Sequence, residues 1–81
     1  MAESILRTKS YDFALRMIKL YKHLVNEKRE FVLSKQLLRS GTSIGANIEE
    51  ASQGQSRADF VHKLSIAHKE SFETSYWLRL L

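Results

Sequence analysis

The chain has 81 residues, 43% hydrophobic and 27% charged, a composition typical of one small globular domain and unlike that of a disordered chain. It contains no cysteine, which excludes disulfides and thiolate metal sites, and no proline, which favours long helices. Nine basic and four acidic side chains in residues 1–39 give that half a charge of +5 within a net charge of +4, which is compatible with phosphate binding and equally with solvated helix faces that keep the protein in solution.

The first predicted helix covers about residues 10–26, where apolar side chains recur at helical spacing. Ser10 is its candidate N-cap, because a serine hydroxyl can bond to the free amides of a first turn, and the earlier Ser4 is the alternative cap, for a turn that contains Ile5 and Leu6. The opposite side is mostly basic, and a polar, aperiodic cluster over residues 26–30 predicts a short connection to an antiparallel neighbour. The candidate phosphate contacts on the first two predicted helices are Arg16, Lys19, Lys22, Lys35 and Arg39.

The second predicted helix, residues 31–53, contains the stretch GTSIGANIEE. Apolar positions keep helical spacing through both of its glycines, which indicates a helix, and the stretch fits neither glycine-rich phosphate-loop pattern. A glycine inside a helix costs about 1 kcal/mol relative to alanine, so we expect these two to admit a neighbouring backbone. The residues predicted to serve packing or assembly are Gly41, Ile44, Gly45 and Ile48, with Asn47 fixing the register by a hydrogen bond.

The third predicted helix, residues 57–81, follows a break at Gly54, a residue type that commonly ends helices in the left-handed conformation. Ser56 is its expected N-cap. Its C-terminal half is apolar on several sides, which two preceding helices cannot cover. This pattern predicts either a missing fourth helix, hence a domain incomplete at its C-terminus, or burial against other subunits. The aromatic residues assigned to packing or assembly are Phe72, Tyr76 and Trp77.

Catalytic patterns are incomplete in this sequence. Asp59 and His62 have the spacing of one half of a di-iron motif, but the second half is absent. Glu49 and Glu50 are adjacent and therefore point about 100° apart on a helix, which is unsuited to acid–base catalysis on one bond. We expect no enzyme activity, metal or cofactor. The alternative from another class is a metal-dependent or hydrolytic enzyme that uses Asp59, His62 and either Glu49 or Glu50.

Two runs, SKQLLRSGTSIGAN at residues 34–47 and KLSIAHKE at residues 63–70, carry a family resemblance. With the residues around them, from about Ser10 to the end, they resemble the four-helix bundle proteins known as 23S rRNA intervening-sequence proteins. The chain has Glu50-Ala51 where many members have Glu-Gly. The resemblance implies an all-α, antiparallel up-and-down bundle of residues 1–81, with three helices present and the family's fourth helix missing.

Family members also resemble the accessory variability proteins of diversity-generating retroelements, which form pentameric barrels with a basic surface implicated in nucleic-acid and reverse-transcriptase binding. The resemblance therefore implies a homo-oligomeric ring, a pentamer, with RNA, DNA or a protein as partner. No apolar run is long enough for a signal peptide or a membrane span, so we expect a cytoplasmic protein without membrane contact. A purely structural self-assembling protein that binds no nucleic acid is the remaining alternative.

Overall fold

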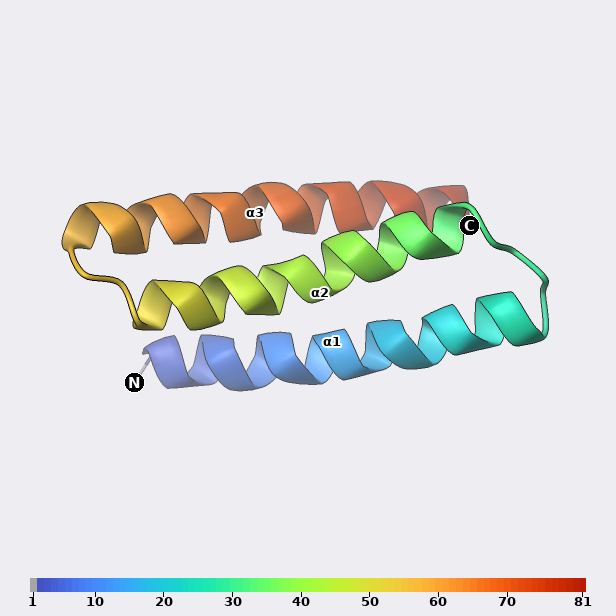
Figure 1. Ribbon diagram of the computed structural model, residues 1–81, viewed down its shortest axis with the longest axis horizontal. Coiled ribbons are helices and arrows are strands. Elements are labelled where there is room, and N and C mark those ends of the chain that lie inside the picture. Colours follow the sequence, from blue (N-terminus) through green and yellow to red (C-terminus); the bar gives the residue numbers. More distant parts are fainter. Residues whose placement is uncertain (1) are drawn as a thin grey trace.

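The computed structural model describes residues 2–81, with side chains from residue 5 onward, so Met1 of the predicted domain lies outside the described residues. Its helices are α1 (Ala2–Asn26), α2 (Leu33–Ser52) and α3 (Arg57–Leu80), and no strand occurs in the described chain. They run up, down and up along a body of 43 × 19 × 16 Å (Figure 1). The predicted all-α helical fold is confirmed.

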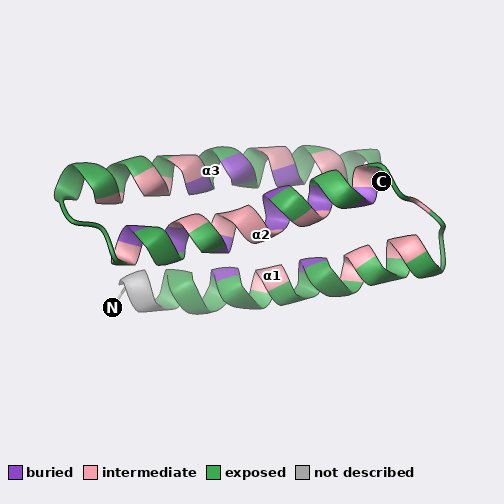
Figure 2. Cartoon of the chain, viewed as in Figure 1, coloured by how far each residue is buried: buried purple, intermediate pink, exposed green. Residues whose placement is uncertain are grey.

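Helix α2 is the central element of the fold. It packs against both α1 and α3, whereas α1 and α3 do not contact each other within the described residues. Buried residues therefore gather where α2 meets its neighbours, and exposed residues cover the outer sides of α1 and α3 (Figure 2). The buried apolar side chains form a small core: Met17, Leu37, Ile48, Ala51 and Ala67. No described helix has an apolar stretch long enough to cross a bilayer.

Helix α1 begins at Ala2, eight residues before the predicted start at Ser10. The expectation of a cap at Ser10 was wrong. Its hydroxyl donates to the carbonyl oxygen of Arg7 at 3.2 Å, inside a continuous helix, and the residue is only 7% exposed. Residues 2–9 contain no proline or glycine, so nothing in this segment interrupts the helix.

Helix α2 begins at Leu33, two residues later than predicted; Val32 occupies its N-cap position, and the side chain of Glu30 caps the first turn in its place. The carboxylate of Glu30 accepts hydrogen bonds from the backbone amides of Leu33 and Ser34, at 2.9 and 2.7 Å. The chain before the cap turns through Arg29, which has a positive φ of 56°. Consequently Phe31 and Val32 lie in the α1–α2 loop, 47% and 72% exposed, and not in the helix.

The Glu30 cap predicts acid sensitivity at the start of α2. The amide of Leu33, with those of Ser34 and Val32, lowers the pKa of Glu30 below its ordinary value of 4.5. Because the folded-state pKa is depressed, the cap should stabilise the fold above about pH 4.5, and this contribution should disappear as the pH falls through the lower folded-state pKa. Glu30→Gln should therefore lower the melting temperature near neutral pH.

The measurement is thermal unfolding of both proteins between about pH 7 and about pH 3. The difference between wild type and Glu30→Gln should shrink towards zero at the acid end. Glu27→Gln, an exposed loop substitution three residues earlier, is the control for loss of one negative charge. A difference that is the same at both ends of the range would contradict the role of the ionised carboxylate.

Helix α3 begins as predicted, because the Ser56 hydroxyl accepts a hydrogen bond from the amide of Asp59 at 3.1 Å. The end of α2 differs in detail from the prediction. That helix ends at Ser52, and Gly54 has no positive φ; its amide instead bonds to the carbonyl oxygen of Ala51 at 3.0 Å. The α2–α3 connection is thus a tight turn of ordinary backbone conformation.

Candidate functional site

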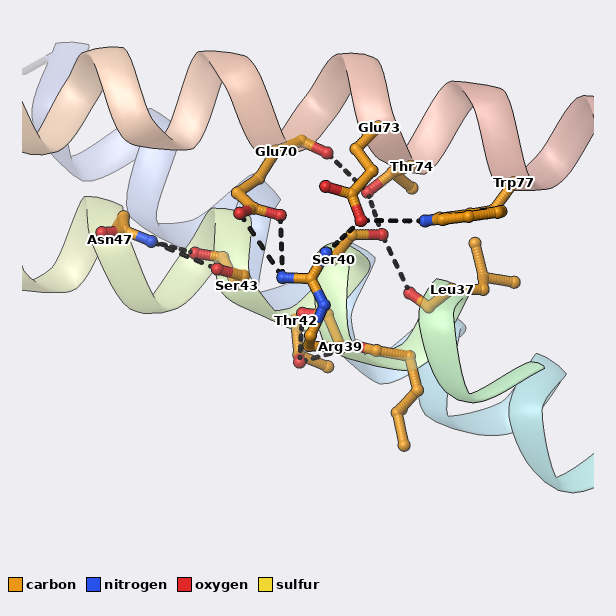
Figure 3. A network of polar contacts seen from close by, with 11 residues as sticks. Leu37, Arg39, Ser40, Thr42, Ser43, Asn47, Glu70, Glu73, Thr74 and Trp77 are labelled. Atoms are coloured by element: carbon orange, nitrogen blue, oxygen red, sulfur yellow. Dashed lines mark hydrogen bonds and ion pairs between the residues drawn. The ribbon is translucent and has the colours of Figure 1, made fainter. Parts of the chain in front are cut away.

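A buried hydroxyl pair joins α2 and α3 near the middle of the molecule (Figure 3). Ser40 is 0% exposed and Thr74 is 3% exposed. The Thr74 hydroxyl lies 2.9 Å from the Ser40 hydroxyl and 2.8 Å from the carbonyl oxygen of Glu70. Ser40 in turn lies 3.4 Å from the carbonyl oxygen of Leu37. No buried side-chain polar atom in the described residues lacks a partner, so the hydrogen bonds of this pair offset the cost of burying its hydroxyls and fix how α2 and α3 align.

Beside this pair, Arg39 of α2 reaches α3 and binds two carboxylates (Figure 3). Its guanidinium donates to the two oxygens of Glu70 at 3.3 and 3.5 Å, and it also pairs with Glu73. The indole N–H of Trp77 donates to Glu73 at 3.0 Å. The Trp77 bond first, and then Arg39, hold the pKa of Glu73 below its ordinary value. Arg39, predicted as a phosphate contact, is thus engaged inside the protein.

The other predicted phosphate contacts have a different environment. Arg16, Lys19 and Lys22 are all exposed on α1, and their spacing of three residues aligns them along its outer side. We call these three residues the basic ridge. Neither they nor the exposed Lys35 of α2 form an ion pair with any side chain described from residue 5 onward. Their charges remain available to an anionic ligand.

Both glycines of the GTSIGANIEE stretch face α1 of the same chain. A Cβ atom at Gly41 would lie 2.5 Å from Cγ of Met17, and one at Gly45 would lie 3.2 Å from the backbone oxygen of Ser10. At these two positions α1 occupies the space that a side chain of α2 would need. Asn47 does not bridge helices as expected, since its amide donates to the carbonyl oxygen of Ser43 at 2.9 Å, within α2 itself.

An open apolar groove of about 420 Å³ lies between α1 and α3, above α2. The predicted packing residues Ile44 and Ile48 form its floor. Side chains of α1, among them Leu6 and Phe13, form one wall, and side chains of α3 form the other. In the α3 wall the exposed residues are Ser71, Ser75 and Leu78, although the sequence pattern placed all three on a packed face.

The outer side of α3 carries exposed apolar side chains, as the sequence pattern indicates. Phe72 is 66% exposed and Tyr76 is 49% exposed. The ring of His68 packs edge-on against Phe72 at 4.9 Å, and Val61, two turns earlier, is 55% exposed. Trp77 is set apart from this side, half-buried and bonded to Glu73. We call Val61, His68, Phe72 and Tyr76 the α3 stripe.

The residues of the enzyme alternative do not converge. Glu49 pairs with Arg7 of α1 at 3.1 Å, whereas Glu50 pairs with Lys63 of α3 at 2.6 Å. Asp59 and His62 are exposed in the first turns of α3. Within the described residues no three histidine, aspartate or glutamate side chains are placed to share a metal ion.

Sequence reasoning missed the acidic half of the polar network. Glu70 is 7% exposed although it is charged, and no pattern in the sequence marks it as buried. One signal was present: Glu70 and Glu73 are one turn apart, and Thr74 and Trp77 follow each of them by four residues, so all four share one side of a helix. A polar side on a helix that also has an apolar side indicates a specific polar partner.

Comparisons with known proteins agree on one relationship. The family described as 23S rRNA-intervening sequence protein matches residues 2–81. Among curated proteins, none matches the chain. Among solved structures, the chain is similar to a protein with unknown function from the S23 ribosomal protein family of Bacteroides thetaiotaomicron VPI-5482, with 64% sequence identity and a TM-score of 0.98 over 100% of this chain and 72% of that chain. The chain therefore belongs to the 23S rRNA-intervening sequence protein family.

Proposed function

We propose that this chain is a non-enzymatic, self-assembling helical module that contacts nucleic-acid phosphates through the basic ridge. The observation that carries the proposal is the ridge itself: three exposed cations along one helix, without an ion-pair partner among the described side chains. Lysine and arginine side chains in such a row supply the sequence-independent part of nucleic-acid binding.

Arg39 is not among the proposed phosphate contacts, because it is paired with carboxylates in the folded protein. Its pKa is raised, mainly by the hydrogen bond to Glu73, and a phosphate would have to displace two carboxylates to reach it. Lys35 is free of such partners and is retained as a contact from α2. The proposed contacts are therefore the basic ridge and Lys35.

Self-assembly is proposed from the α3 stripe. An exposed aromatic side chain in a small protein is common, but a row of four apolar or aromatic residues over four turns of one helix is an association surface. The resemblance favours a ring, and specifically a pentamer, in which each subunit would present one basic ridge. Repetition of a weak phosphate contact would raise the overall affinity through effective concentration. A protein ligand for the same basic surface would need an acidic patch.

The test combines binding and native mass. Binding of a mixed-sequence RNA and of a duplex DNA should weaken steeply with salt, and Arg16→Glu with Lys19→Glu should reduce both the affinity and the salt slope, by about one unit of slope for each lost phosphate contact. Phe72→Glu with Tyr76→Glu should lower the native mass measured by light scattering and, through lost multivalency, the apparent affinity.

The control for total charge is Arg57→Glu with Lys69→Glu, which makes the same charge change on exposed positions of α3. It should retain most of the binding. Equal loss with both double variants would show that only net charge matters, and binding that ignores salt would contradict phosphate contact. An assembly of unchanged mass that binds no nucleic acid would favour the purely structural alternative.

A further inference from the structure

The loop between α1 and α2, residues 27–32, lies at one end of the bundle (Figure 1). Its side chains Phe31 and Val32 are both exposed, and the proposed function does not use them. The basic ridge leads to this end of the molecule, because its last residue, Lys22, lies about one turn before α1 ends at Asn26. The loop therefore adjoins the surface that is proposed to contact phosphates.

An arginine covers part of the ring of Phe31. The Arg29 guanidinium lies over the ring, 5.6 Å from its centroid, which is within the range of a cation–π contact. The backbone of Arg29 has a positive φ, a conformation that glycine adopts without strain and arginine does not. The contact with Phe31 partly offsets that strain, and it holds a cation and an exposed aromatic ring together in one loop.

The charges around this ring are mainly positive. Lys28 and Arg29 are exposed, as is Lys35 in the first turn of α2, and none of the three forms an ion pair among the side chains described for residues 5–81. The carboxylate of Glu30 is directed to the first amides of α2, which satisfy its charge. Glu27 is exposed and opposes the three cations in part. An anionic ligand beside Phe31 therefore meets more positive than negative charge.

We propose that Phe31 stacks on an unpaired base, so that the ligand of the basic ridge and this loop is single-stranded nucleic acid. The inference rests on the proposed phosphate contact and adds to it the form of nucleic acid that is recognised. The bases of a duplex are stacked on their neighbours, whereas an unpaired base can lay its flat face on an aromatic side chain. Such stacking tolerates any sequence, because every base has a π-face.

An anionic membrane surface fits the loop less well. Basic segments that bind anionic lipids carry about four to eight lysines or arginines, whereas residues 27–35 carry three, together with two glutamates. The two exposed apolar side chains, Phe31 and Val32, also offer much less area for insertion than the apolar side of an amphipathic helix. One ring beside cations is, by contrast, the arrangement that a single strand needs.

The test uses the full chain and three labelled ligands of equal length: an oligothymidylate of about 12 nucleotides, an abasic strand, which has the phosphates but no bases, and a duplex. By fluorescence anisotropy at one salt concentration, Phe31→Ala should weaken binding of the oligothymidylate about five- to thirtyfold, the loss expected for one stacked base. Its affinity for the abasic strand and for the duplex should equal that of wild type.

Further variants identify the interaction. Phe31→Tyr keeps an aromatic ring and should retain the affinity for the oligothymidylate, whereas Phe31→Leu is apolar without a ring face and should lose it. Val32→Ala, at the neighbouring exposed position, is the control and should bind as wild type does. Because positions 31 and 32 are exposed in a loop, the circular dichroism melting curves of all these variants should stay close to that of wild type.

The ridge variant, Arg16→Glu with Lys19→Glu, separates this inference from the proposed function, because it should weaken binding of all three ligands. If it does so while Phe31→Ala binds the oligothymidylate as wild type does, or weakens binding of the abasic strand equally, stacking is wrong and the phosphate contact stands. If none of the three ligands binds, both proposals are wrong. Binding to phosphatidylserine vesicles that Phe31→Ala reduces, with strand affinity unchanged, would overturn stacking in favour of a membrane surface.

Discussion

Arg39→Ala is expected to lower the free energy of unfolding by about 1–3 kcal/mol. The reason is the position of Glu70, whose side chain is 9% exposed and whose nearest cation is the Arg39 guanidinium at 3.3 Å. Without it the largely buried carboxylate of Glu70 loses its partner on α2. The expected loss is smaller than that for a fully buried pair, because the Arg39 side chain is 50% exposed and water screens part of the interaction.

The matched control for Arg39→Ala is Lys35→Ala, which removes one positive charge from an exposed position one turn earlier in α2. It should change stability by less than about 0.5 kcal/mol. Urea unfolding can be followed by the emission of Trp77, the single tryptophan, which is bonded to Glu73 in the same network. A double-mutant cycle with Glu70→Gln should show positive coupling. Equal effects of Arg39→Ala and Lys35→Ala would contradict a structural role for the ion pair.

Local signals in the sequence predicted the three helices, but among their starts only that of α3 was predicted correctly. Ser56 was identified as a cap because the capping hydroxyl and the amide of Asp59 are three residues apart, so the bond is set by local geometry alone. Glu30 caps α2 in a related manner, but the side chain reaches forward across Phe31 and Val32, which look like helix residues by hydrophobicity. Ser10 is a residue type that often caps helices, but here it is buried inside α1 and its hydroxyl bonds to the carbonyl oxygen of Arg7.

The packing surfaces depend on crossing geometry, which periodicity does not encode. The sequence indicated that α2 is thin at Gly41 and Gly45, but which helix approaches there follows from the three-dimensional arrangement, and it is α1. In the same way, Arg39 has the exposed position expected of a surface cation, yet Glu70 and Glu73 lie within its reach on α3. A long arginine side chain at the border between two helices can extend into solvent or pair with carboxylates of the neighbouring helix.

The sequence predicted that apolar side chains of α3 would be left uncovered, and the structure shows where they lie. The excess of apolar residues on α3 indicated that two helices could not cover it, and the structure divides that excess into two regions. Leu78 contributes to the groove, whereas Phe72 and Tyr76 belong to the outer stripe. The division matters because the two regions share no side chain, so a substitution in the stripe should leave the groove unchanged.

Gly45→Leu is expected to lower the free energy of unfolding by about 1–3 kcal/mol, through overpacking against α1. The backbone oxygen and carbon of Ser10 would lie 3.2 and 3.4 Å from the first added atom, and a helix backbone cannot move aside as a side chain can. Leucine also has the better helix propensity, by about 0.8 kcal/mol, which partly offsets the loss. Gly45→Ala should therefore be nearly neutral, because its gain in propensity opposes a small displacement of α1.

Ala46→Leu is the matched control, since Ala46 is exposed on the same helix and receives the same new side chain. Its melting temperature should stay close to that of wild type, whereas Gly45→Leu should melt several degrees lower, about 4–8 °C for each kcal/mol in a domain of this size. A Gly45→Leu protein with native stability would show that the packing of α1 does not depend on close approach at this point.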